Sequence, residues 1–537
     1  MMGLSIILVE CDVTSPEGVV QTLRFSDRAI FPMAPTDAAR PNAVWDERLI
    51  EVPSLKRTLF DDLQSLEPGL GVGSMTLANA DRTLDVYQGH VWGEVRVWRW
   101  TYGTAFSTAV ALLSGPAAGT PAFEMRGSAP SRVRLTMFDY RLELEQPLQS
   151  EAFAGNNDGE DVLYEGSLAV KGRLKPVALG NLLAAHIPGV PVNQEIGAYM
   201  LHAGRVRRVG GSTGAPLQVF DRGADGGFAL GGDLSDGPLE PTFPEVSLSP
   251  AHIYALSRLG LMKFNGQPVG TVAFGFLGAA PGGASGDQGY RETPGPIAHR
   301  VLELAGVPAE RIDASIAAAP STAVIGHYVD QPATGREVLG LIARSGMMAI
   351  LPNRQGVWSA VSIGPPAAEA AYVIAADELL SLETDESIGV GAGEFSVGYD
   401  RIWTTYRRDN LLVDLHGTPD EIRLGSEYRF TFLEDAAFKA RHPSAWRKLR
   451  IETAIRNVAD AEAMTQTLRD LFGLRPDGRT RRAWRVVIPF TEAAAAIDLG
   501  ETIGLPASDF GVDDRFLLIG EELLRPRRDQ ITWTLWG

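Results

Sequence analysis

The sequence predicts an α+β, strand-rich, multidomain fold, and three observations support this class. The chain has 537 residues, several times the ~100–200 residues of a typical domain. Its 58 glycines and 34 prolines recur along the whole length, which favours many short strands joined by turns. Helical patterns are few, short and amphipathic, so we expect each helix to lie on a sheet.

Alternating segments predict the strands. In Gly93–Trp100, Val95 and Val97 face one side and Arg96 and Trp98 the other, which is the period of two of a half-buried strand. The same alternation predicts strands over Arg132–Phe138 and Tyr428–Phe432. Packing within a sheet explains their aromatic residues, and a sugar-binding aromatic platform is the alternative.

Capping signals predict three helices. The first follows Thr293, with an early proline and a terminating Gly306, and places Ile297, Val301 and Leu304 on one face. The second begins with the capping box Thr334-Gly-Arg-Glu337 and ends at Gly346, with inward residues Val338, Leu339, Ile342 and Ala343. The third covers Ala459 to Phe472, with Met464, Leu468 and Leu471 inside and Gly473 closing it.

Composition suggests four domains. Polar or glycine-rich breaks divide the chain into a β-rich domain (1–155), a second β-rich domain with a glycine-rich insertion (156–280), an α+β domain (281–395) and a C-terminal β-rich domain with one helix (396–537). The region 221–289 is long, glycine-rich and weakly patterned, so an insertion with a binding role is a hypothesis for it. No fixed repeat is visible, which disfavours a solenoid or a propeller.

Charge and cysteine content exclude several classes of protein. The formal net charge is −17, and an acidic surface repels phosphate backbones, so avid DNA or RNA binding is not expected. Cys11 is the only cysteine, which excludes an intramolecular disulfide and a zinc ribbon. The apolar run Leu4–Val9 is too short to span a bilayer and lacks the basic start of a signal peptide. We therefore expect a protein without stable membrane insertion that remains in the cytoplasm where it is made.

No motif predicts a nucleophile or a phosphate site. Gly210-Gly-Ser-Thr-Gly214 matches the pattern of a nucleophile elbow, but that motif requires a strand followed by a helix. Strand-like sequence on both sides favours a hairpin turn for Ser212 instead. A phosphate-binding loop is missing, and Gly71-Val-Gly73 lacks the third glycine of a dinucleotide fingerprint.

The remaining ionisable residues also have simpler explanations. Eight histidines show no metal-ligand spacing: His90, His186, His202, His252, His299, His327, His416 and His442. His299 is expected to be a surface or packing residue of a helix. The carboxylate pairs Asp61–Asp62 and Asp513–Asp514 are interpreted as solvated turns. We expect no catalytic, cofactor-binding or metal-binding residues, and no cofactor.

Three arginine clusters stand out in this acidic chain. They are Arg401, Arg407 and Arg408; Arg479, Arg481, Arg482 and Arg485; and Arg525, Arg527 and Arg528. Contacts to acidic surfaces of neighbouring subunits would explain them, and ordinary solvated faces are the alternative for any single arginine.

Several stretches resemble tail proteins of long-tailed bacteriophages and prophages. Lys171-Gly-Arg-Leu-Lys-Pro-Val-Ala-Leu-Gly180 followed by Tyr199-Met-Leu-His-Ala-Gly204 resembles one such segment, and Gly73–Asp81 another. Val397-Gly-Tyr-Asp-Arg-Ile-Trp403 is similar to a third, with Ile402 where the family has asparagine, and Ile531–Gly537 resembles the closing strand. The segments occur in the expected order over nearly the whole chain.

This resemblance implies the central hub of a siphovirus-type tail tip or baseplate. It implies β-sandwich or barrel-like domains related to tail-tube folds, assembled as a homo-oligomeric ring, commonly a trimer. The implied partners are the distal tail or tube protein, the tape measure protein and the fibres, and the implied location is the virion, after assembly in the bacterial cytoplasm. DNA would pass through a channel without specific binding, since like charges do not trap it, and we expect the surplus acid to line that channel.

Two other functions remain alternatives. A receptor-binding tip component would use an exposed insertion such as 221–289. A tip-borne cell-wall hydrolase would need a cleft with convergent carboxylates or a Cys/His pair, and Cys11 lies near the N-terminus in an expected strand. The sequence favours a structural protein that is not an enzyme.

Overall fold

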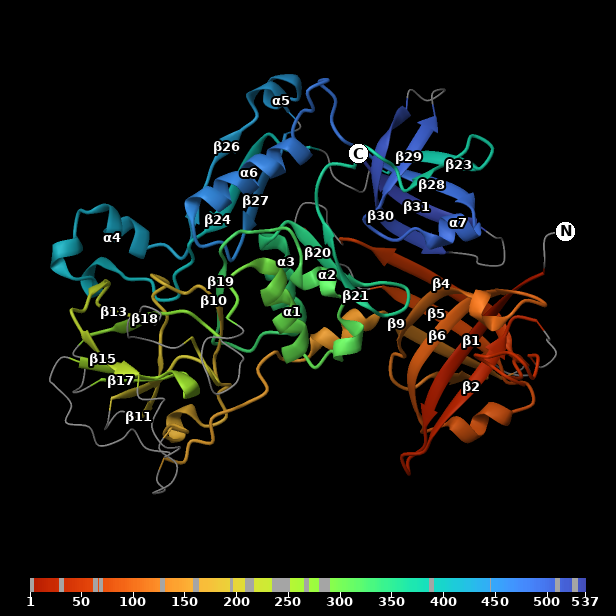
Figure 1. Ribbon diagram of the computed structural model, residues 1–537, viewed down its shortest axis with the longest axis horizontal. Helices are drawn as coiled ribbons and strands as arrows, with labels where there is room; N and C mark the ends of the chain where they lie inside the picture. Colours follow the sequence, from red (N-terminus) through yellow and green to blue (C-terminus); the bar gives the residue numbers. More distant parts are fainter. Residues whose placement is uncertain are drawn as a thin grey trace.

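A computed structural model describes residues 4–28, 33–60, 66, 71–125, 131–157, 164–193, 197–207, 217–233, 252–264, 270–279, 290–385, 391–444, 446–507, 512–523 and 530–537. In this part of the chain the strands form seven separate sheets, and none of them closes into a barrel. The α+β, strand-rich, multidomain class is therefore confirmed. Figure 1 shows an elongated molecule in which the sheets are arranged along the long axis around a small central group of helices.

The N-terminal sheet has five strands in the order β3-β2-β1-β6-β7. Their bounds are β3 (Asp46–Glu47), β2 (Val20–Ser26), β1 (Ser5–Thr14), β6 (Val91–Thr101) and β7 (Val110–Pro116). In β6 Val95 and Val97 are buried, whereas Arg96 and Trp98 are only partly covered, which confirms the predicted alternation. Cys11 is buried in β1, as the sequence predicts for a strand residue.

The largest sheet joins strands from both ends of the chain. Its order is β23-β28-β31-β30-β4-β5-β9-β8, with β29 paired to β30 and β22 to β29. The bounds are β23 (Ser381–Asp385), β28 (Ala483–Pro489), β31 (Gln530–Trp536), β30 (Val512–Leu523), β4 (Leu49–Thr58), β5 (Val72–Ala78), β9 (Arg132–Phe138), β8 (Ala122–Glu124), β29 (Thr502–Ala507) and β22 (Tyr372–Val373). The predicted strand over Arg132–Phe138 is confirmed. The domain boundaries stay a prediction, and this sheet connects the first predicted segment with the last.

Smaller sheets build the rest of the molecule. One contains β11 (Val190–Asn193), β12 (Ala198–Met200), β17 (Leu261–Phe264), β16 (His252–Leu256) and β15 (Ala229–Asp233). Another contains β14 (Ala224–Asp225), β13 (Gln218–Asp221) and β18 (Val272–Gly275). Two pairs are β10 (Val177–Gly180) with β19 (Gly326–Val329), and β20 (Met348–Pro352) with β21 (Trp358–Ser362).

The last sheet has β24 (Glu394–Tyr399) at its centre. On one side β24 pairs with β25 (Arg429–Phe430) and β26 (Leu433–Glu434), and on the other it pairs with β27 (Lys448–Glu452). The helix α6 (Val458–Phe472) packs against β24, and Figure 1 shows this layer at the top of the molecule.

The three predicted helices are present, although Thr293 before the first of them makes no side-chain capping bond. They are α1 (Pro294–Leu304), α3 (Gly335–Ser345) and α6, which begins one residue before the predicted start. The capping box at Thr334 is complete. Four short helices have no strong sequence signal: α2 (Ala314–Ala317), α4 (Pro419–Leu424), α5 (Ala436–Arg441) and α7 (Glu492–Ala496). Within the described residues, no helix combines the length and apolar character needed to cross a bilayer.

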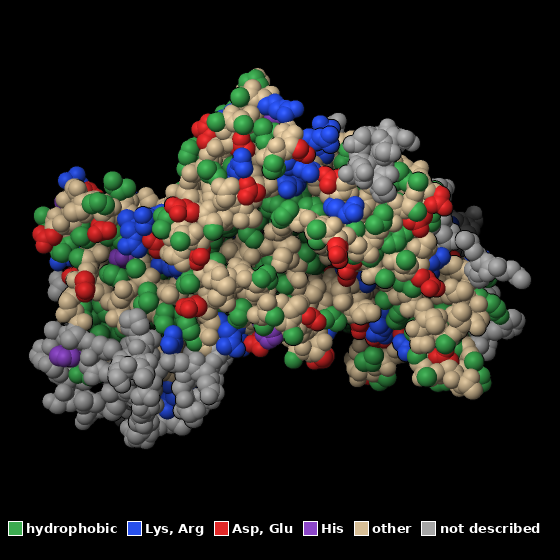
Figure 2. Space-filling model, turned by 45° about the horizontal axis from the view of Figure 1, so that its top comes forward, with side chains coloured by type: hydrophobic (Ala, Val, Ile, Leu, Met, Phe, Trp, Pro, Cys, Tyr) green, Lys and Arg blue, Asp and Glu red, His purple; other side chains and the backbone are tan. Residues whose placement is uncertain are grey.

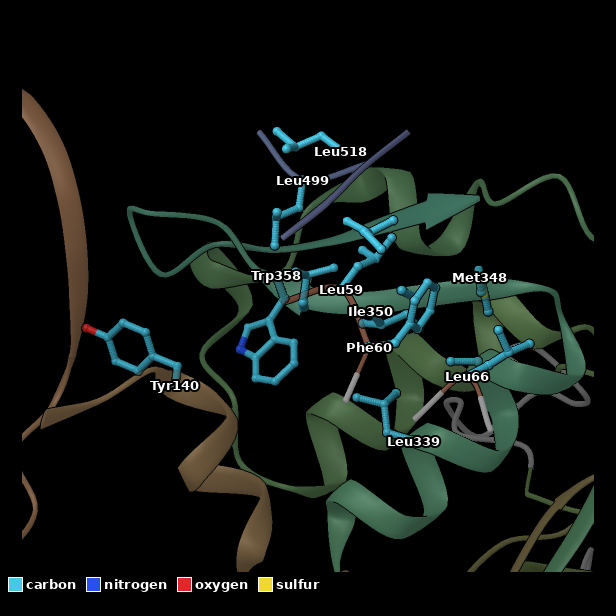
Figure 3. Packing of buried hydrophobic residues seen from close by; sticks show 14 of the residues in the cluster. Leu59, Phe60, Leu66, Tyr140, Leu339, Met348, Ile350, Trp358, Leu499 and Leu518 are labelled. Carbon is cyan, nitrogen blue, oxygen red and sulfur yellow. The ribbon is translucent and has the colours of Figure 1, made fainter. Parts of the chain in front are cut away.

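The main hydrophobic core runs from the N-terminal sheet through the central helices to the C-terminal strands. Figure 3 shows the point where these parts meet, with Trp358 of β21 beside Leu339 of α3 and Ile350 of β20. Leu59, from the end of β4, and Leu499, from the loop before β29, complete the cluster, and all five side chains are buried. The core therefore binds segments that are hundreds of residues apart in sequence into one body.

Candidate assembly site

Two of the segments that resemble tail proteins, Val397–Trp403 and Lys171–Gly204, contact distant parts of the chain. Asp400, in the Val397–Trp403 segment, adopts a left-handed backbone conformation (φ 51°) directly after β24. Its carboxylate lies 3.1 Å from Arg456 and 3.1 Å from Arg423. Arg456 also donates to the carbonyl of Leu183, and Arg423 to that of Ala184. One buried carboxylate thus orients two arginines that join the C-terminal layer to the 181–187 segment.

Two other residues of this segment also act at the junction. The indole N–H of Trp403 donates to the carbonyl of Tyr328 at 2.9 Å. Ile402 is buried in a small cluster with Tyr406, Leu411 and Leu424. An apolar side chain at position 402 fits because its neighbours near α4 are themselves hydrophobic and pack around it.

The Lys171–Gly204 segment shapes the pair β10–β19. Gly180 has a φ of +71°, and a Cβ atom there would collide with the carbonyl oxygen of Ile325, so only glycine fits. The buried His202 accepts a hydrogen bond from the N–H of Ala178 through Nδ1, and burial lowers its pKa to about 4. Lys175 pairs with Glu165 at 2.8 Å. Gly180, His202 and Lys175 therefore fix the conformation of this segment. The side chains of Lys171 and Arg173 are exposed.

The Gly73–Asp81 segment forms a strand and a capped turn. Asn79 is buried. Its side-chain oxygen accepts a hydrogen bond from the N–H of Leu84, and its side-chain nitrogen donates one to Asp85 at 2.7 Å. Asp81 pairs with Arg48 at 2.7 Å, and this hydrogen bond to the guanidinium lowers the pKa of Asp81 well below its usual range. The polar residues of this segment are explained by local structure.

An open groove lies beside the C-terminal layer, between the β25–β26 edge and α6. It has a volume of about 480 Å³ and is lined by Tyr399, Phe430, Thr431, Phe432, Leu433, Val458, Glu462, Thr465 and Gln466. Phe432 is 66% exposed and Val458 is 46% exposed. Within the described chain, β25 and β26 pair with no strand other than β24, so this edge has no neighbour on its outer side.

The structure corrects the expected strand over Tyr428–Phe432. Only Arg429–Phe430 is a strand there. The Phe430 ring packs over Gly398 and beneath Arg450, as expected for sheet packing, whereas Phe432 is 66% exposed. The hydroxyl of Thr431 accepts the N–H of Val397 in place of a backbone carbonyl, which interrupts the strand.

Two arginines near the groove have partners within the chain, whereas one carboxylate on its rim forms no ion pair in the described residues. Arg450 stacks on the Phe430 ring at 3.8 Å, and Arg429 lies 3.8 Å from Asp400. Glu462 on α6 is exposed and forms no ion pair within the described part of the chain. The groove therefore combines exposed apolar side chains with polar ones such as Thr431 and Gln466, and it carries the Glu462 carboxylate on its rim.

A second, polar pocket crosses the ten-stranded sheet. It has a volume of about 290 Å³ and is lined by residues of β23, β28, β31, β30 and β4, including Glu383, Arg485, Thr534, Glu522 and Lys56. Beneath it Glu521 is almost fully buried and lies 2.7 Å from Arg354 and 3.6 Å from Arg57. These charges join the two ends of the chain, and sequence reasoning missed them because each sits in an ordinary strand or turn pattern.

The other candidate residues are distributed over separate parts of the fold. Ser212, Asp61, Asp62 and the cluster at Arg525–Arg528 lie outside the described residues. The turn expected at Asp513–Asp514 is wrong, because both residues belong to β30, where Asp514 pairs with Arg475 at 2.8 Å. No group of three His, Cys, Asp or Glu side chains suited to a metal ion occurs among the residues that the structure describes.

The histidines and arginines do not gather at one site either. His299 lies on α1, partly exposed, with Nδ1 3.4 Å from Glu303, as expected for a surface residue. His186 is buried and stacks on Phe220, and burial lowers its pKa to about 3. Arg401 pairs with Glu427 at 2.6 Å, and Arg485 with Glu522 at 2.9 Å, so these arginines have partners within the chain.

Comparison with known proteins gives structural similarity without sequence similarity. No protein-family model matches the chain, and no curated protein sequence matches it. Among solved structures, it is similar to a tail protein from Neisseria meningitidis (TM-score 0.42, 8% identity, 99% of this chain and 96% of that chain). It is also similar to the 43 kDa tail protein of prophage MuSo2 from Shewanella oneidensis (TM-score 0.40, 8% identity, 99% and 98%). A further similar structure is the PdpA-VgrG complex from Francisella (TM-score 0.34, 5% identity), of which 53% of the chain is covered.

Proposed function

We propose that this protein is a structural component of a bacteriophage tail, and specifically the central hub of a siphovirus-type tail tip or baseplate. In this role it joins the tail tube to distal tip proteins and fibres, and copies of it form part of the DNA channel as a trimer. It catalyses no reaction and acts in the virion.

The observation that carries the proposal is the position of the resembling segments. Asp400 and Trp403 join the C-terminal layer to residues 183–184 and 328, and Gly180 permits the close approach to Ile325. Residues that distinguish an enzyme family would be expected to converge on a reacting centre. Here Asp400, Trp403 and Gly180 instead contact distant parts of the chain and fix their relative positions, as expected of a structural protein.

The acidic balance supports the channel as part of this proposal. A net charge of −17 would let DNA slide along a wall built from several copies, because like charges do not trap it. Figure 2 shows acidic and basic side chains interspersed on one face of the molecule, so the surplus acid is not concentrated on that face. We propose that the surplus acid faces the channel of the assembled ring.

Localisation on the particle tests the proposal. Antibodies against the purified chain, followed by immunogold electron microscopy of intact particles, should label the distal end of the tail tube. Zymography on peptidoglycan should show no clearing by the purified chain. Label elsewhere on the particle, or a monomeric chain that clears cell wall, would contradict the hub.

A further inference from the structure

We propose that the groove between the β25–β26 edge and α6 binds the Leu168–Arg173 turn of a second copy of this chain. The inference deepens the proposed function, on which it rests, by naming a contact of the homo-oligomer. It is carried by two surfaces of complementary chemistry, each without a partner within the described chain.

The groove offers exposed apolar side chains and one carboxylate to an incoming segment. Its exposed walls are Phe430, Phe432 and Val458, and its volume is about 480 Å³, enough for a branched aliphatic side chain with its flanking backbone. Glu462 on the rim has no ion-pair partner among the described residues. Exposed rings beside an unpaired sheet edge are typical of an interaction surface.

The turn at η4 (Leu168–Val170) has the matching features. Leu168 is 73% exposed, and Lys171 and Arg173 follow it at the surface without ion pairs in the described chain. Ser167 accepts the N–H of Ala169 and caps the turn, so Leu168 is presented by an ordered backbone. These cations belong to the Lys171–Gly180 segment but do not contribute to its structural contacts.

Charge distinguishes this turn from several other exposed aliphatic residues. Several of the others stand directly beside a carboxylate that would repel Glu462: Val86 beside Asp85, Val413 beside Asp414, and Ile422 beside Glu421. Juxtaposed like charges in an interface are unfavourable. The turn at Leu168 instead brings two cations toward the free carboxylate.

The occupant must come from another molecule. In Figure 1 the ochre turn that contains η4 projects from the lower edge, whereas β26 and α6 lie at the top. A chain therefore cannot fill its own groove. Because the two surfaces differ, the contact is heterologous, and such contacts generate closed rings when the rotation between copies allows closure.

Sedimentation velocity and light scattering on the purified full chain test the contact. The wild type should self-associate. Leu168→Asp and Phe432→Asp should each weaken association at least ~30-fold, as expected for an anchor residue and its pocket. Val413→Asp, at an equally exposed aliphatic position outside both surfaces, should associate as the wild type does. Far-UV circular dichroism and thermal unfolding check that each variant is folded.

Mixing distinguishes this heterologous contact from other dimer interfaces. Leu168→Asp chains keep an intact groove and Phe432→Asp chains keep an intact turn, so an equimolar mixture should form heterodimers that do not grow further. Glu462→Lys and Lys171→Glu should each weaken association, and chains carrying both changes should regain part of it.

Three outcomes would overturn the inference. They are a monomeric wild type, association that survives Leu168→Asp, and a mixture of the two variants that stays monomeric. The proposed function fails independently, through immunogold label away from the tail tip. A monomer located at the tip would reject only this contact, and a self-associating chain absent from tails would reject only the hub.

Discussion

Asp400 and Arg456 form a buried ion pair, with side chains 9% and 7% exposed and 3.1 Å between carboxylate and guanidinium. Arg456 also donates hydrogen bonds to the carbonyls of Arg401 and Leu183. The pair therefore connects the turn after β24 to a segment more than two hundred residues earlier in the chain. A charge so placed is tolerated only because its partner and these carbonyls compensate its desolvation.

Removing one member of this pair should be costly. Asp400→Asn leaves Arg456 buried without its counter-ion, so we expect the free energy of unfolding to fall by about 3–5 kcal/mol. Urea denaturation followed by fluorescence measures the change. Glu452→Gln, at an exposed position of β27 where the ion pair is 3.8 Å long, is the control and should change stability by less than ~0.5 kcal/mol. Equal effects of the two substitutions would show that the junction contributes little.

Gly180 should be irreplaceable for steric reasons. Gly180→Ala requires an unfavourable left-handed conformation and pushes a Cβ against Ile325, so it should cost about 2–5 kcal/mol in the free energy of unfolding. Gly172 also has a positive φ, of +77°, but no atom lies within 4 Å of the position that a methyl group would take there. Gly172→Ala should therefore cost only ~1–2 kcal/mol. The difference between the two values, from parallel denaturation curves, isolates the steric clash.

The capping box of α3 offers a matched pair of threonines. Thr334 accepts the N–H of Glu337 and closes a complete box, whereas Thr293, the N-cap of α1, makes no side-chain capping bond. Thr334→Ala should destabilise the protein by ~1 kcal/mol, and Thr293→Ala by less than ~0.5 kcal/mol. Thermal unfolding of both variants checks the order, and a larger loss at Thr293 would contradict this account of the caps.

Stability should fall as the pH decreases from about 6.5. Burial lowers the pKa of His186 and His327 to about 3 and that of His202 to about 4, against 6.5 for an exposed histidine. Between these values the unfolded chain binds more protons than the folded chain, so protonation favours unfolding. The contribution is complete above pH 6.5 and is lost toward the folded-state pKa values.

Denaturation at pH 6.5, 5.5 and 4.5 measures this slope. Carboxylates begin to titrate toward the lowest of these pH values, and they contribute equally to the wild type and to a histidine variant. His202→Gln should reduce the slope by about one proton, or ~1.4 kcal/mol per pH unit. A slope unaffected by His202→Gln would mean that this histidine does not titrate differently on folding.

Local signals explain which elements could be predicted. The box at Thr334, the prolines of α1 and the glycine after α6 act within one helical turn, so they can be read from neighbouring residues. The four short helices were missed because they have one to two turns, too few for a periodic apolar face. Among the strands, Arg132–Phe138 was readable because its alternation is uninterrupted, whereas the Tyr428–Phe432 pattern was broken by a hydrogen bond from Val397 to Thr431.

The sequence predicted no site residues, and the candidate site emerged from the structure. Asp400, Trp403 and Gly180 lie in the resembling segments and act at junctions between parts of the chain. The groove was not foreseen, since Phe432 and Glu462 are thirty residues apart and become neighbours only when α6 packs beside the strand edge. The buried Glu521 was likewise invisible, because a carboxylate in a strand has no sequence mark of burial.

By itself, the sequence determined the strand-rich α+β class, the three longer helices and their caps, and a strongly acidic chain. Only the tertiary structure decided that β4 pairs with β30, that Asp400 meets Arg456, and that Phe432 faces solvent. The physical reason is the sequence separation of the interacting residues. Helix periodicity and capping involve residues only a few positions apart. Sheet pairing, burial of charge and the shape of a groove depend on contacts between distant segments, and these exist only once the whole chain has packed.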